Sequence, residues 1–300
     1  MPPSIAIGVM AHNEEANIGR LLESLLAQTA GERIAQIIVV ASGCTDRTCA
    51  IVEAMSARDA RIKLAAQAER GGKVSAINLF LTMATEPLLL VSGADMILEP
   101  QTVFEIVAPF DDPDIGMVGA HPIPSNDPTT FLGFASHLLW RLHHEVSLIQ
   151  PKMGELIAFR NIFRGLDPDM LADEVQIEHG VRSVGYRVAY APNAVIRNRG
   201  PETLREFIAQ RTRWLAFNMQ IEREQRIPVS TLRTGTLWRA LRSYLRADKP
   251  RLDWVAATAF LELSCRVRAR FAAPALRSSR HRLWSQATTT KDVARQASTV

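Results

Sequence analysis

The sequence has few of the features that mark several common classes of protein. Its three cysteines, Cys44, Cys49 and Cys265, include no CxxC pair, which argues against a disulfide framework and against a structural zinc site. The seven histidines form no HExxH motif, and the chain has no GxSxG motif and no Walker phosphate loop. It also has no helix-turn-helix, zinc-finger or RNA-recognition signature, so nucleic acid is not an expected partner.

Long hydrophobic runs are absent as well. No stretch reaches the roughly 20 apolar residues that a membrane-spanning helix needs. The best candidate, residues 254–263, contains Glu262 and is soon followed by three arginines. The N-terminal sequence MPPSIAIGVMAHNEE has no charged segment before its short apolar run, so no signal peptide is expected. With the cysteine content, this favours a reducing cytosolic location and leaves contact with the inner face of the membrane open.

What the chain does have is material for a core and an uneven distribution of charge. Hydrophobic residues make up 47% of the 300 positions, which is enough for one large domain with an appendage. The net charge is only +4, but arginines are dense from Arg197 to Arg282. A basic C-terminal third is suited to anionic ligands such as nucleoside diphosphates, or to an anionic membrane surface.

Apolar strands alternate with amphipathic helices over the first hundred residues. Residues 4–10, 36–40 and 87–92 are short apolar runs typical of buried parallel strands. Helical spacing of apolar residues follows the first run over residues 17–28, and further helices are expected at 46–57 and 73–85. The alternation predicts an α/β fold of Rossmann type, with a mostly parallel sheet and helices on both faces.

The second half is less regular. Strands are expected at 116–120 and 186–190, and helices at 131–149, 204–222 and 252–270. We expect the domain to cover residues 1–226, followed by an amphipathic helical extension over 227–280 and a loosely ordered tail over 281–300. Within the extension, residues 237–246 place apolar side chains on one face and arginines elsewhere. That pattern is compatible with peripheral membrane contact and equally with packing on the core.

The most informative motif is Gln210-Arg211-Thr212-Arg213-Trp214, which reads QxxRW and follows the acidic pair Asp173-Glu174 by about 36 residues. Guanidinium groups match phosphate oxygens, and an indole ring packs on the apolar face of a sugar. In these features the chain resembles the family-2 glycosyltransferases, the inverting group with a GT-A fold that includes cellulose, chitin and hyaluronan synthases. The resemblance runs from about residue 4 to about residue 218, without the membrane helices of the processive synthases.

The resemblance implies a metal ligand and a catalytic base. Relatives place an Asp-x-Asp after the third strand, where this chain has Gly93-Ala94-Asp95, so Asp95 is the expected ligand of Mg²⁺ or Mn²⁺. Relatives also place an acidic pair eleven residues before a Gly-Tyr. That spacing puts Glu174 at the position of the base, with Asp173 as the alternative.

The resemblance also implies a donor site and an acceptor side. The partners are then a nucleotide sugar and a saccharide or lipid-linked saccharide. UDP is the first expectation for the nucleotide, although Ala41 and Ser42 replace the two acidic residues that usually contact uracil. Implied donor-binding residues are Ala11, Asn13, Glu14, Glu15, Ser42, Asp46, Lys73, Asp95 and Arg213, and implied acceptor-side residues are Arg160, Gln210 and Trp214.

Two other functions are compatible with the sequence. Ala41 and Gly93 stand where relatives have acidic residues, and the loss of these residues would be expected in a non-catalytic nucleotide-sugar-binding or scaffold protein. A nucleotidyltransferase with a related sheet is a third option, but it would leave the QxxRW motif without a role.

Overall fold

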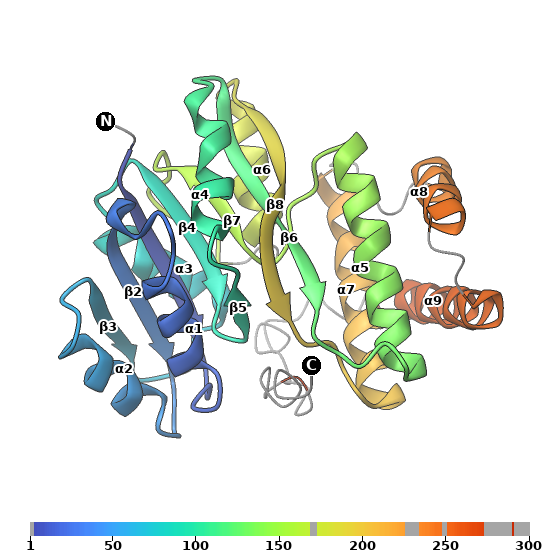
Figure 1. Ribbon diagram of the computed structural model, residues 1–300, viewed down its shortest axis with the longest axis horizontal. Coiled ribbons are helices and arrows are strands. Elements are labelled where there is room, and N and C mark those ends of the chain that lie inside the picture. The colour runs from blue at the N-terminus through green and yellow to red at the C-terminus, as the bar shows by residue number, and fades with distance from the viewer. Residues whose placement is uncertain (1–2, 169–172, 226–233, 248–250, 273–289, 291–300) are drawn as a thin grey trace. The chain divides into compact units, whose positions relative to one another are not determined.

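The computed structural model describes residues 3–168, 173–225, 234–247, 251–272 and 290 (Figure 1). The chain divides into two compact units whose segments alternate along the sequence. Among the described residues, the first unit contains those up to Pro122 and Met153–Asn198, and the second contains Ile123–Lys152 and those from Arg199 to Thr290. The boundary expected near residue 226 stays a prediction, and the tail over 281–300 lies almost wholly outside the described residues.

Four parallel strands form one half of the sheet of the first unit. They lie side by side in the order β3, β2, β1, β4. Because the chain crosses from strand to strand through helices, all four carboxyl ends lie at the same edge. The four strands are β1 (Ile5–Ala11), β2 (Ile34–Ser42), β3 (Ile62–Gln67) and β4 (Leu88–Gly93).

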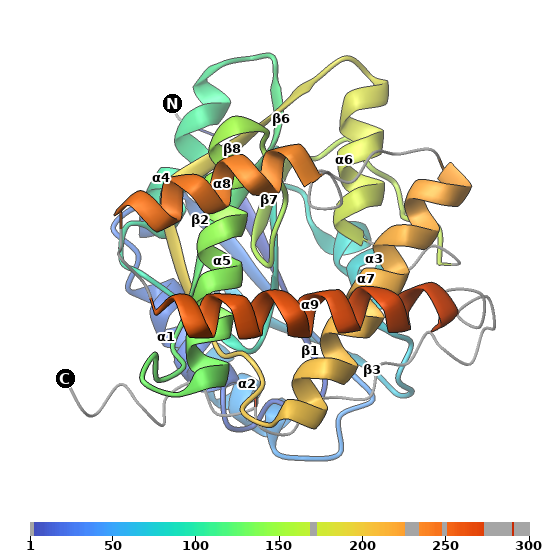
Figure 2. The ribbon, with the colours of Figure 1, turned by 90° about the vertical axis from the view of Figure 1, so that its right-hand side faces the viewer.

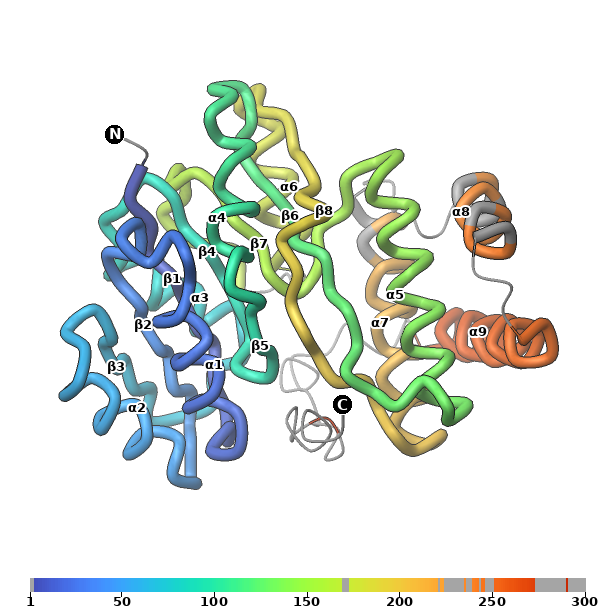
Figure 3. Tube along the Cα trace, viewed as in Figure 1, coloured from blue at the N-terminus to red at the C-terminus, as the bar shows by residue number. Residues whose placement is uncertain are grey.

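The other half of the eight-stranded sheet continues in the order β7, β6, β8, β5, and its registered pairs are antiparallel. The predicted α/β class and helical layers are confirmed, but the sheet is mixed because β7 enters beside β4 in the opposite direction. The path can be followed along the trace in Figure 3. These strands are β5 (Met96–Leu98), β6 (Ile115–Pro124), β7 (Ile157–Arg160) and β8 (Arg187–Asn198).

Helices cover both faces of this sheet because β1 presents apolar side chains on both. Ile5, Ile7 and Val9 pack in one apolar cluster, while Ala6 and Met10 pack in the other. The first cluster includes buried residues of α1 (Ile18–Leu26), α2 (Thr48–Ser56) and α4 (Thr102–Val107), and the second those of α3 (Lys73–Met83) and α6 (Asp173–Ser183). Short 3₁₀ turns, η1 (Gly31–Arg33) and η2 (Ala108–Asp111), complete the unit.

One glycine in β1 is required by this packing. A Cβ atom at Gly8 would lie 2.7 Å from the ring of Phe80, which belongs to α3. The aromatic ring therefore packs directly on the strand backbone. This close approach holds α3, and with it the N-terminus of that helix, at a fixed depth beside the sheet.

The second unit is helical. It consists of α5 (Phe131–Ile149), α7 (Leu204–Gln225), α8 (Thr234–Ala247) and α9 (Leu252–Ala272). Helix α9 packs across α7 and α5, and α8 packs on α5, as Figure 2 shows. Ala240 and Tyr244 of α8 are buried, so the described part of its apolar face packs within the protein. No helix among the described residues is long and apolar enough to cross a membrane.

Candidate functional site

A cation and two carboxylates meet in the first unit, from two helices on the same face of the sheet. The Nζ atom of Lys73 lies 2.8 Å from Oδ2 of Asp173 and 3.8 Å from Oε1 of Glu174. Lys73 is the first residue of α3, and Gly72 reaches this position with a φ of 84°. Asp173 and Glu174 begin α6, where the helix dipole favours negative charge. The structure therefore brings Lys73 next to an acidic pair that lies a hundred residues later in the sequence.

The protonation equilibria of this group are shifted by burial and by its own charges. Burial raises the pKa of Glu174, and the neighbouring charge of Asp173 raises it further, while Lys73 opposes the shift. Burial disfavours the Lys73 cation, but Asp173 and Glu174 outweigh this effect and leave its pKa above the ordinary value. The Asp173 side chain is 5% exposed and that of Glu174 is 33% exposed, so Glu174 is the carboxylate that water and ligands can reach.

A second pair of carboxylates lies at the turn between β4 and β5. Asp95 sits in this turn, and Asn198 of β8 pairs with Met96 beside it. A hydrogen bond from Asn198 reaches Glu155 at the same place, and Lys73 and Glu174 also act on that carboxylate electrostatically. Burial, followed by the charge of Asp95, raises the pKa of Glu155 to about 7. The five groups therefore form one charged cluster in the first unit.

Glu155 was missed by the sequence reasoning, for a reason that the sheet explains. That reasoning took polar residues just after strands, whereas Glu155 lies just before β7. Because β7 runs antiparallel to β4, with Ile157 opposite Val91, the residues before β7 lie near the carboxyl end of β4. A signal was available, since a lone glutamate precedes the apolar run Leu156–Phe159.

The chemistry of Asp95 is compatible with a divalent cation, although the donor set is small. Mg²⁺ needs only one or two protein carboxylates when phosphate oxygens and water complete its shell. At Gly93 an added Cβ would lie 2.7 Å from Oδ1 of Asp95, so the Asp95 carboxylate lies close to the place of the absent first acidic residue. Among the described residues no three His, Cys, Asp or Glu side chains converge as a ready metal cage. Asp95 is the side chain that would hold the ion.

The loops after β1 and β2 are joined by their own polar side chains. Asn13, at a φ of 53°, accepts a hydrogen bond from the Thr45 backbone N–H at 2.8 Å. The backbone N–H of Glu15 donates to Asp46 at 3.0 Å, and the Glu15 carboxylate pairs with Arg47 at 3.1 Å.

The other residues expected in these two loops are also engaged. Glu14 is buried and accepts a hydrogen bond from Asn17 at 3.0 Å. Ser42 accepts one from the Gly71 backbone N–H at 3.1 Å, and Ala11 pairs with Ala41 at the ends of β1 and β2. The predicted donor residues of the two loops therefore lie together at the carboxyl edge of the parallel strands, as part of one hydrogen-bonded surface.

Arg160 lies elsewhere in the first unit. It is opposite Leu88, at the amino end of β4, whereas Asp95 follows the carboxyl end of that strand. Its Nε atom donates to the Ile115 carbonyl at 2.8 Å, and its guanidinium lies over the rings of Phe110 and Tyr186. The geometry gives Arg160 a role in fixing the start of β6, and it does not bring this residue to the charged cluster.

The QxxRW segment belongs to α7 in the second unit. Trp214 is partly buried against the cluster that α7 shares with α9. The Nζ atom of Lys152 and the guanidinium of Arg211 each lie 4.6 Å from the centre of its ring. Gln210 is exposed. The Trp214 ring is therefore in contact with two cations and is not a freely exposed surface.

Arg211 also ties α7 to α9. Its Nε atom lies 2.6 Å from Oε2 of Glu262, and Arg266 lies 3.1 Å from the other carboxylate oxygen. The two arginines lower the pKa of Glu262 although its burial would raise it. The variable second position of QxxRW therefore carries a structural ion pair, which the motif alone did not predict.

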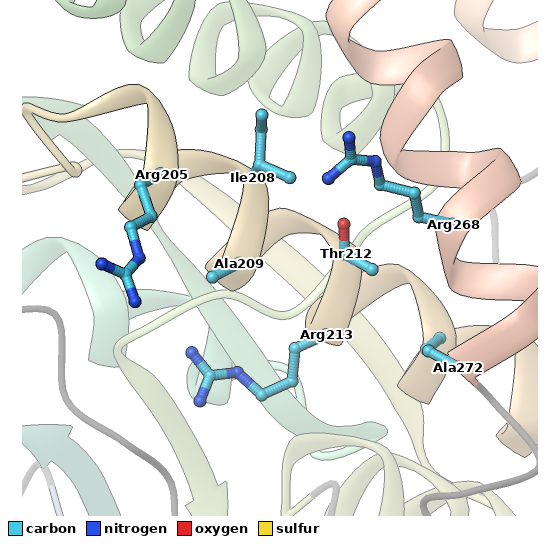
Figure 4. Close-up of a pocket in the computed structure, with 8 residues that line it drawn as sticks. Arg205, Ile208, Ala209, Thr212, Arg213, Arg268 and Ala272 are labelled. Atoms are coloured by element: carbon cyan, nitrogen blue, oxygen red, sulfur yellow. The ribbon is translucent and has the colours of Figure 1, made fainter.

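Arg213 lines a cavity of about 530 Å³ along α7 (Figure 4). Burial lowers the pKa of Arg213 below its ordinary value. Arg205 points to the same side of α7 in the figure, and Arg268 reaches toward the helix from α9. The remaining wall is largely apolar, and includes Ile208, Ala209, Ala216 and Ala272. The cavity thus combines cationic and apolar walls.

Two curated proteins show what the chain resembles in sequence. A probable glycosyltransferase of Bacillus subtilis, YdaM, is 24% identical over 235 residues, covering 73% of this chain and 56% of that protein. The poly-β-1,6-N-acetyl-D-glucosamine synthase of Staphylococcus aureus is 24% identical over 216 residues, covering 68% and 52%. This chain spans about half the length of these relatives.

Solved structures support the fold. A mannosyltransferase from Pyrobaculum calidifontis, PcManGT, described in complex with GDP-Man and Mn²⁺, has a TM-score of 0.64 at 20% identity and covers 91% of this chain and 88% of its own. GalNAc-T7, described with UDP, GalNAc and Mn²⁺, has a TM-score of 0.51 at 13% identity and covers 65% and 43%. The expected GT-A architecture is confirmed.

A family model described as "Glycosyltransferase like family 2" matches residues 2–216, more than two thirds of the sequence. That stretch contains the charged cluster of the first unit and the QxxRW segment of the second. The resemblance drawn from the motifs is confirmed, and the chain belongs to glycosyltransferase family 2.

Proposed function

We propose that the chain transfers a sugar from a nucleoside-diphosphate sugar to a hydroxyl group of an acceptor, by direct displacement with inversion at the sugar carbon. The observation that carries the proposal is the cluster around Lys73. It combines a cation suited to a diphosphate with two carboxylates, Glu174 and Glu155, whose pKa values are raised, that of Glu155 to about 7. Membership of family 2 supports glycosyl transfer as the reaction class.

Glu174 acts as the general base in this proposal. Asp173 is almost fully buried and is held by Lys73, whereas Glu174 is one third exposed and lies farther from the cation. A raised pKa makes Glu174 a stronger proton acceptor than an ordinary carboxylate, so it can remove the proton of the attacking hydroxyl. Asp173 is a positioning residue that holds Lys73 and keeps negative charge beside Glu174.

Lys73 and Asp95 receive the leaving diphosphate. The ammonium of Lys73 stands at the first turn of α3, where the helix dipole adds to its charge, and it donates to phosphate oxygens. A divalent cation held by Asp95, Mg²⁺ or Mn²⁺, supplies additional neutralisation of the diphosphate when bound. Mn²⁺ is named with both structural neighbours, which supports this choice.

We assign donor binding to the loops after β1 and β2. Arg213 is assigned to the diphosphate, and Gln210 and Trp214 to the acceptor sugar, as the resemblance to the family implies. The neighbours are named with GDP-Man and with UDP and GalNAc, so a nucleotide sugar is supported while the base stays open. A saccharide or lipid-linked saccharide acceptor agrees with a relative that is a polysaccharide synthase.

A non-catalytic sugar-nucleotide-binding protein is the second candidate. The observation that favours it is the single carboxylate at the metal position, with Gly93 in place of the first acidic residue. Both candidates predict donor binding, but only the first predicts turnover.

The deciding experiment follows donor consumption with Mn²⁺ over a panel of UDP-, GDP- and TDP-sugars and saccharide acceptors. A parallel thermal-shift screen identifies which donor binds, because a ligand specific to the folded state raises the melting temperature. Turnover by the native chain that Glu174→Gln abolishes supports the transferase. Donor binding with no turnover by either chain would establish the second candidate instead.

A further inference from the structure

A stripe of large apolar side chains runs along α9 on its solvent-facing side. Phe260, Leu263, Val267 and Phe271 are 73%, 59%, 50% and 81% exposed. Their spacings of three, four and four residues place them on one face of the helix. We refer to these four residues as the α9 stripe.

The stripe is unusual within this molecule. The described residues include eleven large hydrophobic side chains that are exposed, and five of them, the stripe and Leu252, lie on this one helix. Scattered exposed hydrophobic residues are normal on protein surfaces, but a continuous row of them indicates a binding surface.

The stripe also lies opposite the face by which α9 packs within its own unit. Thr258, Cys265 and Ala269 are buried, and the last two belong to the cluster shared with α7. At 3.6 residues per turn these three lie about half a turn away from the stripe. Helix α9 therefore buries small side chains on this face and leaves four large apolar ones exposed on the opposite face, although Trp254 near its start packs against Phe131 and Phe134.

Two arginines flank the stripe. On the same helical projection, Arg268 and Arg270 lie on opposite sides of it, and both are exposed. Neither makes an ion pair with another residue that the structure describes, whereas Arg266 and Arg251 on or beside α9 are paired with Glu262 and Asp253. The charge left available beside the stripe is therefore positive.

We propose that α9 binds a bilayer surface that contains anionic lipids, lying in the headgroup region with the stripe inserted and Arg270 at the lipid phosphates. Arg268, which reaches toward α7, adds positive charge on the other margin of the stripe. Phe, Leu and Val on one side and arginines at its margins are the composition of an interfacial helix. The available positive charge selects an anionic lipid surface over a neutral apolar partner. The inference does not depend on glycosyl transfer.

Vesicle co-sedimentation of the full chain tests this assignment, with phosphatidylcholine vesicles prepared with and without phosphatidylglycerol. We expect binding to the vesicles that contain phosphatidylglycerol, weakened by high salt. The double substitution Phe260→Ser/Phe271→Ser should weaken binding by about tenfold or more, since it removes the two most exposed aromatic side chains. Arg270→Gln should weaken it by about fivefold.

The matched control is Phe104→Ser/Val184→Ser. These two apolar residues of the first unit are 49% and 63% exposed, so their loss should leave vesicle binding unchanged. The assignment is overturned if the native chain does not co-sediment with vesicles containing phosphatidylglycerol, or if Phe260→Ser/Phe271→Ser binds them as well as the native chain does. It is also overturned if sedimentation velocity shows a native dimer that this double variant converts to a monomer, because a second copy would then be the occupant.

Discussion

The charged group around Lys73 in the first unit and the one around Glu262 in the second are balanced in opposite ways. In the first unit a single cation, Lys73, faces Asp173 and Glu174, with Glu155 within electrostatic reach. In the second unit a single carboxylate, Glu262, is held between Arg211 and Arg266. The first group is more exposed to water than the second, and the two also differ in the ratio of their charges.

The ratio decides what each group can do. In the first group, burial raises the pKa values of Glu174 and Glu155, and the neighbouring carboxylates raise them further. Glu155, with a pKa of about 7, can take up and release a proton near neutral pH. Surplus guanidinium lowers the pKa of Glu262, which stays ionised and joins two helices. The pKa of the proposed general base, Glu174, is therefore raised, whereas the pKa of the carboxylate that joins two helices, Glu262, is lowered.

The largest effect is expected from Glu174→Gln, which tests whether the group around Lys73 carries out proton transfer. We expect a loss of about a thousandfold in kcat with little change in donor affinity, because removal of a general base typically costs 10²- to 10⁴-fold. Donor consumption and thermal shift measure the two quantities. Glu178→Gln, one turn later on α6 and paired with Arg182 at the surface, is the matched control and should retain activity. Equal activity of the two variants would remove Glu174 from the mechanism.

Replacing Lys73 tests the role of the cation in the same group. Lys73→Met should lower kcat/KM by about 10- to 100-fold, because a charged contact to the leaving diphosphate is lost. Lys73 lowers the pKa of Glu174, so its loss should raise that pKa further and shift the acidic limb of the pH–rate profile to higher pH. The control is Lys63→Met on the exposed side of β3. An unshifted limb would contradict the coupling.

In the second unit, Glu262→Gln should reduce stability without acting on proton transfer. It leaves two guanidinium groups without their shared partner, at an expected cost of about 2 kcal/mol in urea denaturation. The folded-state pKa of Glu262 is below its ordinary value of 4.5, so its contribution is complete above that pH and is lost as the pH falls through the lower, folded-state value. The variant should lack this acid-dependent loss.

The control for that measurement is Asp253→Asn. Asp253 of α9 also pairs with an arginine, Arg251 just before the helix, but the two side chains are 61% and 60% exposed. Exposed pairs contribute little, so the change in the free energy of unfolding should be much smaller than that caused by Glu262→Gln. A similar cost for the two substitutions would show that burial does not set the strength of the Glu262 pair.

The smallest expected effect concerns the metal position. Gly93→Asp restores a second carboxylate but moves Asp95, whose Oδ1 atom lies 2.7 Å from the new Cβ position. We expect about a two- to fivefold lower Mn²⁺ concentration for half-maximal thermal stabilisation by the metal alone. A melting temperature that responds to Mn²⁺ identically in both chains would argue that Asp95 does not hold the ion.

The parallel half of the fold was predictable because its signals are local. The apolar runs that became β1, β2 and β4 are bounded by polar loops, and the helix over Phe131–Ile149 was expected at those residues. The antiparallel half was not predictable, because the direction in which β7 pairs with β4 leaves no trace in the spacing of its four apolar residues. The position of Glu155 followed from that direction and was missed with it.

The site was predicted in part for the same reason. Lys73, Asp173 and Glu174 stand in recognisable motifs, but only the packing of α3 and α6 on one face of the sheet shows that they form an ion pair. Arg160 matched a motif position, yet the strand register carries it to the amino end of β4. Trp214 matched as well, and its two covering cations, Lys152 and Arg211, became visible only in the helical unit.

By itself the sequence determined the family, the alternation of strands and helices, and the chemical types of the acidic and QxxRW motifs, since these depend on residue order and short-range spacing. Tertiary structure alone decided which charges share a cluster, which pKa values rise or fall, and which face of α9 is left in solvent. Electrostatic energy and burial depend on distances in space, and residues far apart in the chain set those distances.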